Sequence, residues 1–298
     1  MYDVNSIMVD TKPLSRDDSS ALLIQSLARG LAVIRTFDHD HQRLTISQVA
    51  QRAQLSRATA RRFLLTLTDL GYASFDGKLF ALTPRVLDLG YAYLSSTPFW
   101  EVAQPHMEAV VAQLHESCSI SVLQDNDIVY VARVPTKRIM TVTLGIGSHL
   151  PAGATSMGRV LLAYASEAQR ERYFATAELT RFTPRTITDP ARLRELLREV
   201  VQREWALVDQ ELEEGVRSVA VPVRDAAGRV IAAMNLSGHA SRVTVAQMKR
   251  EFVPALLQAS ARITATLMLR SPGAGRPSGL PHLERPRSEP PLPRRLSL

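Results

Sequence analysis

The sequence of 298 residues predicts a mixed α/β (α+β) protein with two domains. Two patterns carry this prediction: a run of helical periodicity that ends in a hairpin, and a longer region of helices and antiparallel strands. The charge is also uneven along the chain. Residues 43 to 85 hold seven Lys or Arg against two Asp, which is most of the net charge of +7. A local positive excess of this kind favours a polyanionic partner.

The chain begins with a polar, aperiodic segment, residues 1–20, which we expect to be disordered. A first domain over residues 21–83 then starts with a helix predicted from Ala21 to Phe37. Apolar residues recur at helical spacing on one face of this helix: Ile24, Leu27, Leu31 and Ile34. We expect this helix to be the first of the domain and to pack behind the two helices that follow.

Those two helices are joined by a tight turn at Gln54 and Leu55. Thr45 and Ser56 are placed to cap them, because a hydroxyl oxygen can accept from the free N–H groups of a first turn. The apolar stripe of the second helix has a period of three to four residues: Ala60, Phe63, Leu64, Leu67 and Leu70. Gly71 ends this helix, because glycine takes a positive φ without strain.

Strands over Tyr72–Phe75 and Leu79–Leu82 flank Asp76-Gly77, which is a strong hairpin signal. Helix, turn, helix and hairpin in this order predict a winged helix-turn-helix. The second helix would be its recognition helix, which meets DNA base edges with its N-terminal end.

Small and basic residues gather at that end of the helix. Ala58 and Thr59 allow a close approach to the major groove, and the neighbouring arginines can reach phosphates or a guanine edge. The alternative is an ordinary solvated helix face, but the hairpin and the local charge favour DNA. The residues expected to contact DNA are Thr45, Ser56, Arg57, Ala58, Thr59, Arg61, Arg62 and Lys78.

After the wing, Thr83-Pro84 predicts a helix start, because proline is favoured at the first helical position. This helix, within a linker over residues 84–98, is strongly apolar to about Leu94. An apolar helix beyond the wing needs a partner, so we interpret it as a linker and a dimer contact.

The second domain is predicted over residues 99–270, as one sheet with helices on its faces. Its helices are expected at 99–116, 155–165, 167–174, 190–204 and 244–269. Its strands are expected at 118–124, 128–134, 139–144, 206–208, 218–224 and 229–237, with a loop at 145–153. Seven of the 17 prolines follow Arg270, so the Pro/Arg-rich tail, 271–298, is predicted to be disordered and solvated.

Several classes of function are disfavoured by the sequence. One cysteine, Cys118, excludes an internal disulfide and fits the cytoplasm, and we find no signal peptide and no apolar run long enough to span a bilayer. Nucleophile, zinc-binding and complete GxGxxG motifs are missing, so we expect neither an enzyme nor a cofactor. Isolated histidines are interpreted as surface residues rather than metal ligands: His39, His41 and His115, the last beside Glu116.

Two segments of the second domain are candidates for a small-molecule site. Residues 151–159 run from a glycine-containing loop into a helix whose N-terminus attracts carboxylate, although ordinary capping by Thr155 or Ser156 explains the pattern equally well. On the strand at 229–237, Asn235 needs a hydrogen-bond partner, either a ligand or the backbone. It would share a face with Ile231, Ala233 and Ser237.

Three arginines on or beside strands could pair with a carboxylate: Arg133, Arg138 and Arg217. For each of them a solvent-exposed role is the better single interpretation.

Over roughly residues 21 to 270 the chain resembles the IclR family of transcriptional regulators. The matching stretches are Ser26–Leu31, Leu55–Arg62, Leu150–Ala163, Asp209–Gly215 and Ala220–Val223. Three further stretches resemble the PcaR/PcaU/PobR branch of that family: Arg138–Met140, Thr155–Leu161 and Trp205–Glu211.

The resemblance implies a GAF-like effector-binding domain with its pocket between the sheet and the helix at 155, and a homodimer or dimer of dimers on promoter DNA. The effector residues that it implies are Thr155, Ser156, Met157, Gly158, Asp209, Ser218, Asn235 and Ser237. The chain departs from the family pattern in two places. Val208 stands where many members have Asp, and in this chain the acidic residue, Asp209, comes one position later. Asn235 stands where serine is common.

We therefore predict a transcriptional regulator controlled by a small aromatic or dicarboxylic acid. The branch implies an activator of protocatechuate, 4-hydroxybenzoate or β-ketoadipate catabolic genes, with RNA polymerase as a candidate partner and no membrane contact. One alternative is a repressor of another catabolic operon that a different acid releases. Another is an enzyme or a small-molecule-binding protein whose winged helix pairs with protein.

Overall fold

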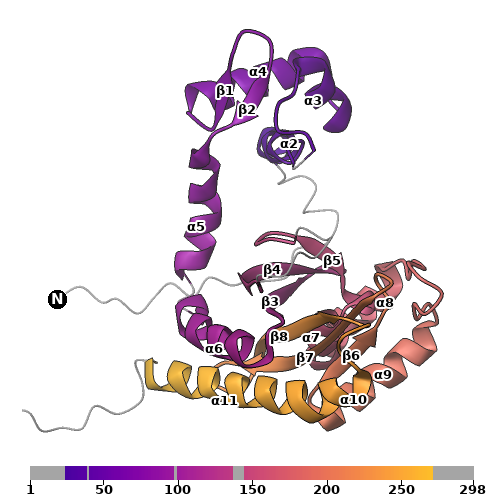
Figure 1. Ribbon diagram of the computed structural model, residues 1–298. Coiled ribbons are helices and arrows are strands. Elements are labelled where there is room, and N and C mark those ends of the chain that lie inside the picture. The colour runs from indigo at the N-terminus through magenta and orange to yellow at the C-terminus, as the bar shows by residue number, and fades with distance from the viewer. Residues whose placement is uncertain (1–23, 39, 97–98, 137–143, 271–298) are drawn as a thin grey trace, which may run out of the picture. The chain divides into compact units, whose positions relative to one another are not determined.

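The computed structural model describes residues 24–38, 40–96, 99–136 and 144–270 (Figure 1). The chain divides into two compact units between residues 97 and 98. Several predictions lie outside the described residues: both disordered ends, His39, Arg138 and most of the strand expected at 139–144.

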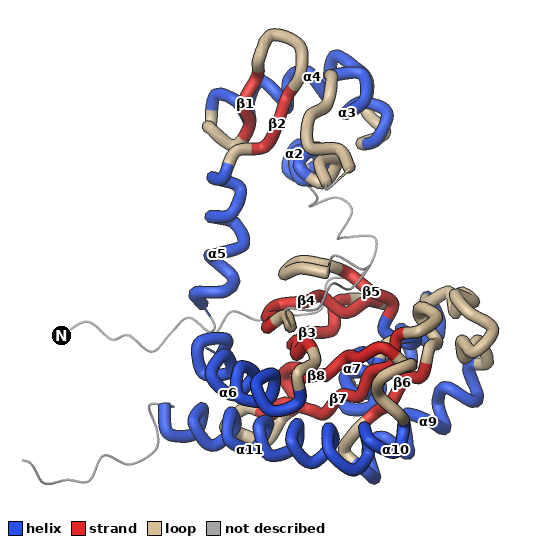
Figure 2. Tube along the Cα trace, viewed as in Figure 1, coloured by secondary structure: helices blue, strands red, loops and turns tan. Residues whose placement is uncertain are grey.

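The first unit contains the predicted helices and hairpin (Figure 2): α2 (Gln25–Ile34), α3 (Ile46–Arg52), α4 (Arg57–Asp69), β1 (Ala73–Phe75) and β2 (Phe80–Leu82). Thr45 forms a reciprocal capping box with Gln48, and the Ser56 hydroxyl accepts from the Thr59 N–H. Gly71 takes a φ of +80° after α4. The capping and turn predictions are confirmed.

α2 packs against α4 as predicted, but most of its apolar stripe does not face the core. Ile24, Leu27 and Leu31 are 67%, 62% and 45% exposed, whereas Val33 is buried in the core of this unit. Gly30 faces Phe63 of α4, and Ile34 is the one stripe residue that packs against this core. Leu70, expected in the stripe of α4, is also exposed because it lies beyond the last turn.

A second exposed apolar surface lies on α5 (Leu87–Ser96), which follows a 3-10 turn at Pro84–Val86. Thr83 caps the turn by accepting from the Arg85 N–H. The exposed apolar residues of α5 are Leu87, Leu89, Tyr91 and Tyr93. The role of this helix as linker and dimer contact stays a prediction.

The second unit is built on a six-stranded antiparallel sheet in the order β5-β4-β3-β8-β7-β6 (Figure 1). The strands are β3 (Ser117–Gln124), β4 (Asp127–Val134), β5 (His149–Pro151), β6 (Ala206–Asp209), β7 (Val216–Arg224) and β8 (Val230–His239). We expected only a loop where β5 lies. This strand has three residues and pairs with β4 at the sheet edge, so it is too short to show a period in sequence.

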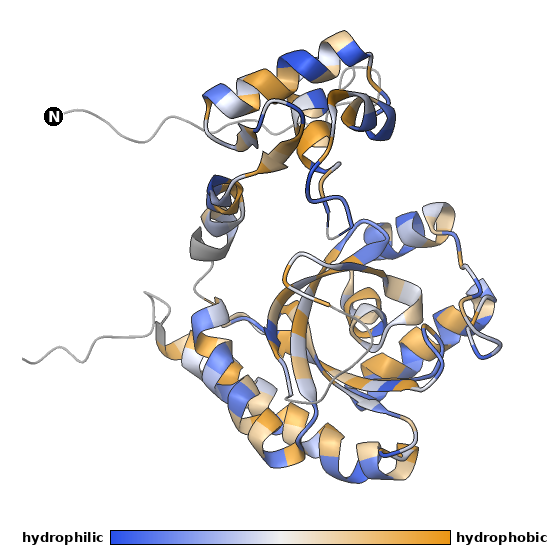
Figure 3. Ribbon diagram, turned by 45° about the horizontal axis from the view of Figure 1, so that its top comes forward, coloured by the Kyte–Doolittle hydropathy of each residue, from blue (hydrophilic) through white to orange (hydrophobic). Residues whose placement is uncertain are grey.

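Helices cover both faces of the sheet, and Figure 3 shows hydrophobic residues along the strands and on the helix sides that meet them. One face packs against α6 (Phe99–Leu114) and α11 (Val253–Arg270), with Met107, Phe252 and Leu256 in the core. The other face packs against α7 (Ser156–Tyr164), which α9 (Pro190–Arg203) and α8 (Glu167–Thr176) flank.

A bulge where β7 meets β8 changes one predicted face. Val223 pairs with Ala232, but the next pair is Arg224 with Val230, so Ile231 is the extra residue. Ile231 therefore packs in the core with α6 and α11 rather than with Ala233. The alternation from Ala233 to Ser237 is as predicted.

The long closing helix expected at 244–269 is interrupted. A short turn of α10 (Val245–Gln247) leads into a π-helical turn at Met248–Phe252, because Pro254 has no N–H to continue the α-helical bonds. Contrary to the sequence-based expectation, residues 245–269 are long and apolar enough to cross a membrane by length and composition. In the structure Leu256, Ala259 and Ile263 of this segment pack in the sheet core.

A substitution at Gly158 tests the close packing of α7 against the preceding turn. A β-carbon there would lie 2.6 Å from the Ala152 carbonyl carbon, so Gly158→Ala should lower the free energy of unfolding by about 3 kcal/mol. Urea denaturation followed by tryptophan fluorescence measures this, because Trp100 and Trp205, the protein's two tryptophans, both lie in the second unit. Gly145→Ala meets no neighbour and should leave stability unchanged. Equal stability of the two variants would contradict the close contact.

Candidate functional site

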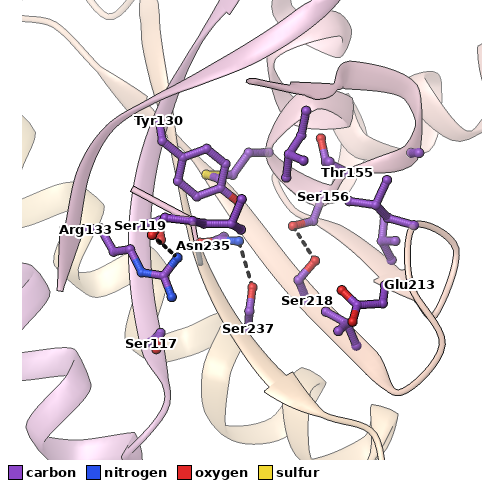
Figure 4. A pocket seen from close by; sticks show the side chains of 17 residues that line it. Ser117, Ser119, Tyr130, Arg133, Thr155, Ser156, Glu213, Ser218, Asn235 and Ser237 are labelled. Carbon is purple, nitrogen blue, oxygen red and sulfur yellow. Dashed lines mark hydrogen bonds between the residues drawn. The ribbon is translucent and has the colours of Figure 1, made fainter. Parts of the chain in front are cut away.

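A cavity of about 280 Å³ lies between the sheet and the start of α7 (Figure 4). It is slightly smaller than the roughly 300–1,000 Å³ of drug-sized ligand sites, so it suits a small metabolite. Apolar side chains make up much of its wall: Leu144, Leu150, Met157, Val208, Leu212 and Val216.

The polar side chains of the floor follow two adjacent rows across the sheet. In the first row Arg133 of β4 pairs with Ser119 of β3, which pairs with Asn235 of β8. In the second row Ser117, Ser237 and Ser218 lie side by side on β3, β8 and β7. Cross-strand partners share a face, so the register itself brings these polar groups together under α7.

The N-terminus of α7 forms the opposite wall. Thr155 caps the helix by accepting from the Gly158 N–H, which is the capping that the sequence left as an alternative. Ser156 is buried and lines the cavity, and its hydroxyl accepts from Ser218 at 2.9 Å. The first-turn N–H groups and the helix dipole make this wall favourable for an anion.

Among the described residues, two charged side chains line the cavity, one on each side (Figure 4). Arg133 donates to the Leu144 carbonyl at 2.9 Å, and no ion pair joins it to an acidic residue of the described chain. Glu213 stands beyond Ser218. Burial raises the pKa of Tyr130, which also lines the cavity, to about 12, so this hydroxyl stays neutral and can donate a hydrogen bond.

Asn235 is the central polar group of the floor and is only 4% exposed. Its Nδ2 donates to the Ser237 hydroxyl at 3.0 Å. Its Oδ1 is buried and has no hydrogen-bond partner among the residues that the structure describes. A buried acceptor without a partner is uncommon, because leaving it unpaired costs about 1–3 kcal/mol.

A buried ion pair fixes the wall formed by α7. Arg159 donates to both Glu211 oxygens, at 2.8 and 2.5 Å, and its Nε donates to the Gly153 carbonyl at 2.9 Å. The side chains are 4% and 10% exposed. Glu211 also accepts from the Ile187 N–H. The pair therefore joins α7 to the chain around 187 and to the segment 211–216 that lines the cavity.

The structure brings most of the predicted effector residues together, but not all of them. Six of the eight line the cavity: Thr155, Ser156, Met157, Ser218, Asn235 and Ser237. Gly158 packs against Ala152 instead, and Asp209 binds Arg217 and Arg185 away from the cavity. Burial opposes ionisation of Asp209, but hydrogen bonds from Arg217 and Gln210 outweigh it and lower its pKa.

Sequence reasoning missed four polar lining residues: Ser117, Ser119, Tyr130 and Glu213. The alternation Ser117-x-Ser119 was a usable signal, because residues two apart on a strand share a face. Of the three candidate arginines, Arg138 lies outside the described residues. Arg133 lines the cavity, whereas Arg217 pairs with Asp209 outside it.

In the first unit, the expected DNA-contact residues have two kinds of environment. Arg57, Ala58, Arg61 and Arg62 are exposed on α4, and the three arginines form no ion pair with the described residues. Thr45 and Ser56 serve as helix caps, Ser56 also bonds the Thr59 hydroxyl, and Lys78 is exposed in the hairpin turn.

Comparison with known protein families finds two matches. Residues 26–77 match the IclR helix-turn-helix domain, and residues 91–265 match the C-terminal domain of the bacterial transcriptional regulator IclR.

Three known proteins illustrate the similarity. The Pca regulon regulatory protein of Pseudomonas putida is 47% identical, over 79% of this chain and 81% of its own. The p-hydroxybenzoate hydroxylase transcriptional activator of Acinetobacter baylyi is 39% identical, over 78% and 88%. The crystal structure of an IclR homologue from Microbacterium hydrocarbonoxydans, complexed with 4-hydroxybenzoate, has a TM-score of 0.72 at 28% identity and covers 82% of this chain and 99% of its own.

The buried ion pair gives a test of how the cavity wall is held. Glu211→Gln leaves the Arg159 charge buried without a counter-charge and should lower the free energy of unfolding by about 3 kcal/mol. Urea denaturation followed by tryptophan fluorescence measures the loss. Glu195→Gln breaks an exposed ion pair with Arg192 and should change stability little. If the two variants were equally stable, the ion pair would not hold the wall.

Proposed function

The chain belongs to the IclR family of transcriptional regulators, and we propose that it controls aromatic-acid catabolic genes in response to a small carboxylate effector. The observation that carries the proposal is the cavity: a small, mostly apolar space that has a helix N-terminus on one wall and an arginine on another. Members of this family are transcription regulators and not enzymes. Similar proteins regulate the pca genes and p-hydroxybenzoate hydroxylase.

For DNA, we propose that α4 is the recognition helix and that Arg57, Arg61 and Arg62 contact phosphates or guanine edges. Their exposure and their lack of acidic partners among the described residues support this assignment. The small side chain of Ala58 lets the helix approach the groove. Thr45 and Ser56 would act through their helix ends, whose N–H groups suit phosphate.

For the effector, we propose that its carboxylate binds at the N-terminus of α7, beside Ser156 and Ser218. Free N–H groups of the first turn and the helix dipole favour an anion there. The apolar side chains of Met157, Leu150 and Val208 suit the faces of an aromatic ring. An aromatic acid fits this combination better than a fully polar metabolite does.

We also propose that the protein works in the cytoplasm as a homodimer or dimer of dimers, on a promoter site with two half-sites. The exposed apolar faces of α2 and α5 support association, because such faces are usually covered by a partner. An activator role is proposed from the named activity of the relative from Acinetobacter baylyi, and RNA polymerase is the partner that such a role would need. A promoter–reporter assay with and without the chain gives the sign of regulation.

DNA recognition can be tested with the double variant Arg57→Ala with Arg61→Ala. If one arginine makes a bidentate contact to guanine, promoter affinity should fall by about 1–3 kcal/mol. Fluorescence anisotropy with a labelled promoter fragment, at fixed salt, measures this. Arg172→Ala removes an exposed charge from α8 and should leave affinity unchanged. Unchanged affinity in the double variant would refute the recognition helix.

Effector binding can be tested by thermal shift against a panel of aromatic and dicarboxylic acids. An acid at 100 times its Kd should stabilise the folded protein by about 2.7 kcal/mol. Ser156→Leu fills the cavity beside the helix N-terminus and should abolish this shift, while promoter affinity without effector stays normal. A normal shift in Ser156→Leu would move the effector site elsewhere. No shift with any acid would overturn the carboxylate proposal.

A further inference from the structure

The unpartnered Oδ1 of Asn235 is a hydrogen-bond acceptor at the centre of the cavity floor. The side chain lies on β8, a central strand, and its neighbours in the same row are Ser119 and Ala220. One of the two N–H groups of its Nδ2 donates to Ser237, whereas its Oδ1 has no partner among the described residues. Figure 4 shows Asn235 between Arg133 on one side and Ser218 with Ser156 on the other.

A ligand that fills the cavity excludes water from this oxygen. The ligand then has to supply a donor of its own, because a buried acceptor left unpaired weakens binding. Carboxylates, ketones and ethers only accept hydrogen bonds, so none of them can serve Asn235 Oδ1. A hydroxyl group can.

We propose that Asn235 accepts a hydrogen bond from a ring hydroxyl of the effector and so selects hydroxylated aromatic acids over unsubstituted and keto- or dicarboxylic acids. This inference rests on the proposed function, because it assumes a carboxylate effector in the same cavity. Asn235 is then a specificity-determining residue, while the start of α7 recognises the carboxylate that all these acids share.

The sheet register places the two recognition points at a suitable separation. Ser218, which bonds Ser156 at the start of α7, is the diagonal neighbour of Asn235, since Ala220 is its direct partner. Diagonal neighbours are roughly 7–8 Å apart. One benzene ring with a carboxylate and a hydroxyl at separate positions spans such a distance. Met157 and Val208 flank the space between them.

Isothermal titration of the full-length chain with matched acids tests the proposal. The better of 3- and 4-hydroxybenzoate should bind about tenfold or more tightly than benzoate. The matching aminobenzoate, which also donates, should keep much of this advantage. The matching fluorobenzoate, similar in size but without a donor, should bind like benzoate. Adipate, an aliphatic dicarboxylate, should bind weakly.

A substitution tests whether the side-chain amide of Asn235 determines the preference for hydroxybenzoate over benzoate. Asn235→Ala should reduce the ratio of hydroxybenzoate to benzoate affinity to about twofold or less while benzoate still binds. Ser121→Ala is the matched control: its hydroxyl is also buried without a partner, but it lies outside the cavity. This variant should keep the full ratio, which shows that a buried polar group in the sheet does not by itself set selectivity.

The possible outcomes separate this proposal from the one it rests on. Equal affinity for benzoate and both hydroxybenzoates, or an unchanged ratio in Asn235→Ala, overturns the role of Asn235 but leaves the carboxylate site intact. If 4-formylbenzoate, whose ring substituent only accepts hydrogen bonds, bound more tightly than the hydroxybenzoates, the role of Asn235 as an acceptor would also be overturned. The amide would then be donating. Failure of every acid to bind overturns the effector proposal itself.

Discussion

The second unit depends on the buried pairing of Arg159 with Glu211. Removing two charges from water is costly, and the pair compensates only because its geometry is bidentate and its remaining hydrogen-bonding groups are used. Arg159 also binds the Gly153 carbonyl, and Glu211 accepts from the Ile187 N–H. One interaction thus holds the turn before α7, the helix itself and the segment after β6, which are three parts of the cavity wall.

Arginines are used differently in the two units. In the second unit ten of the 17 described arginines pair with carboxylates: Arg159, Arg185, Arg192, Arg194, Arg203, Arg217, Arg224, Arg229, Arg242 and Arg250. On α4, by contrast, no described acidic residue pairs with the arginines. A charge that is already paired contributes little to binding a polyanion. The unpaired charge gathered on α4 therefore supports the proposal that this helix contacts DNA, which net charge alone could not do.

Local signals in the sequence predicted much of the fold and part of the site. Caps at Thr45 and Ser56 and the glycine at 71 act through their own neighbours, so the bounds of α3 and α4 could be predicted closely. The covered face of α2 and the bulge at Ile231 depend on contacts between distant segments, which periodicity does not encode. The same holds for the cavity: the strand register shows that Ser119 lies between Arg133 and Asn235, and the sequence did not place these three side chains together.

Val208, which departs from the family pattern, shows how the position of a residue along β6 determines whether its side chain faces the cavity. Side chains alternate between the faces of a strand, so a carboxylate one position further along cannot replace one that faces the cavity. Asp209 accordingly points to the other side of β6 and binds Arg217, while Val208 faces the cavity beside Ser218. The family resemblance implied an acid at position 208; valine there makes this part of the wall apolar. Under the proposed function, the polar contacts to the effector in this region then come from the serines, Asn235 and Glu213, around a mostly apolar wall that suits an aromatic ring.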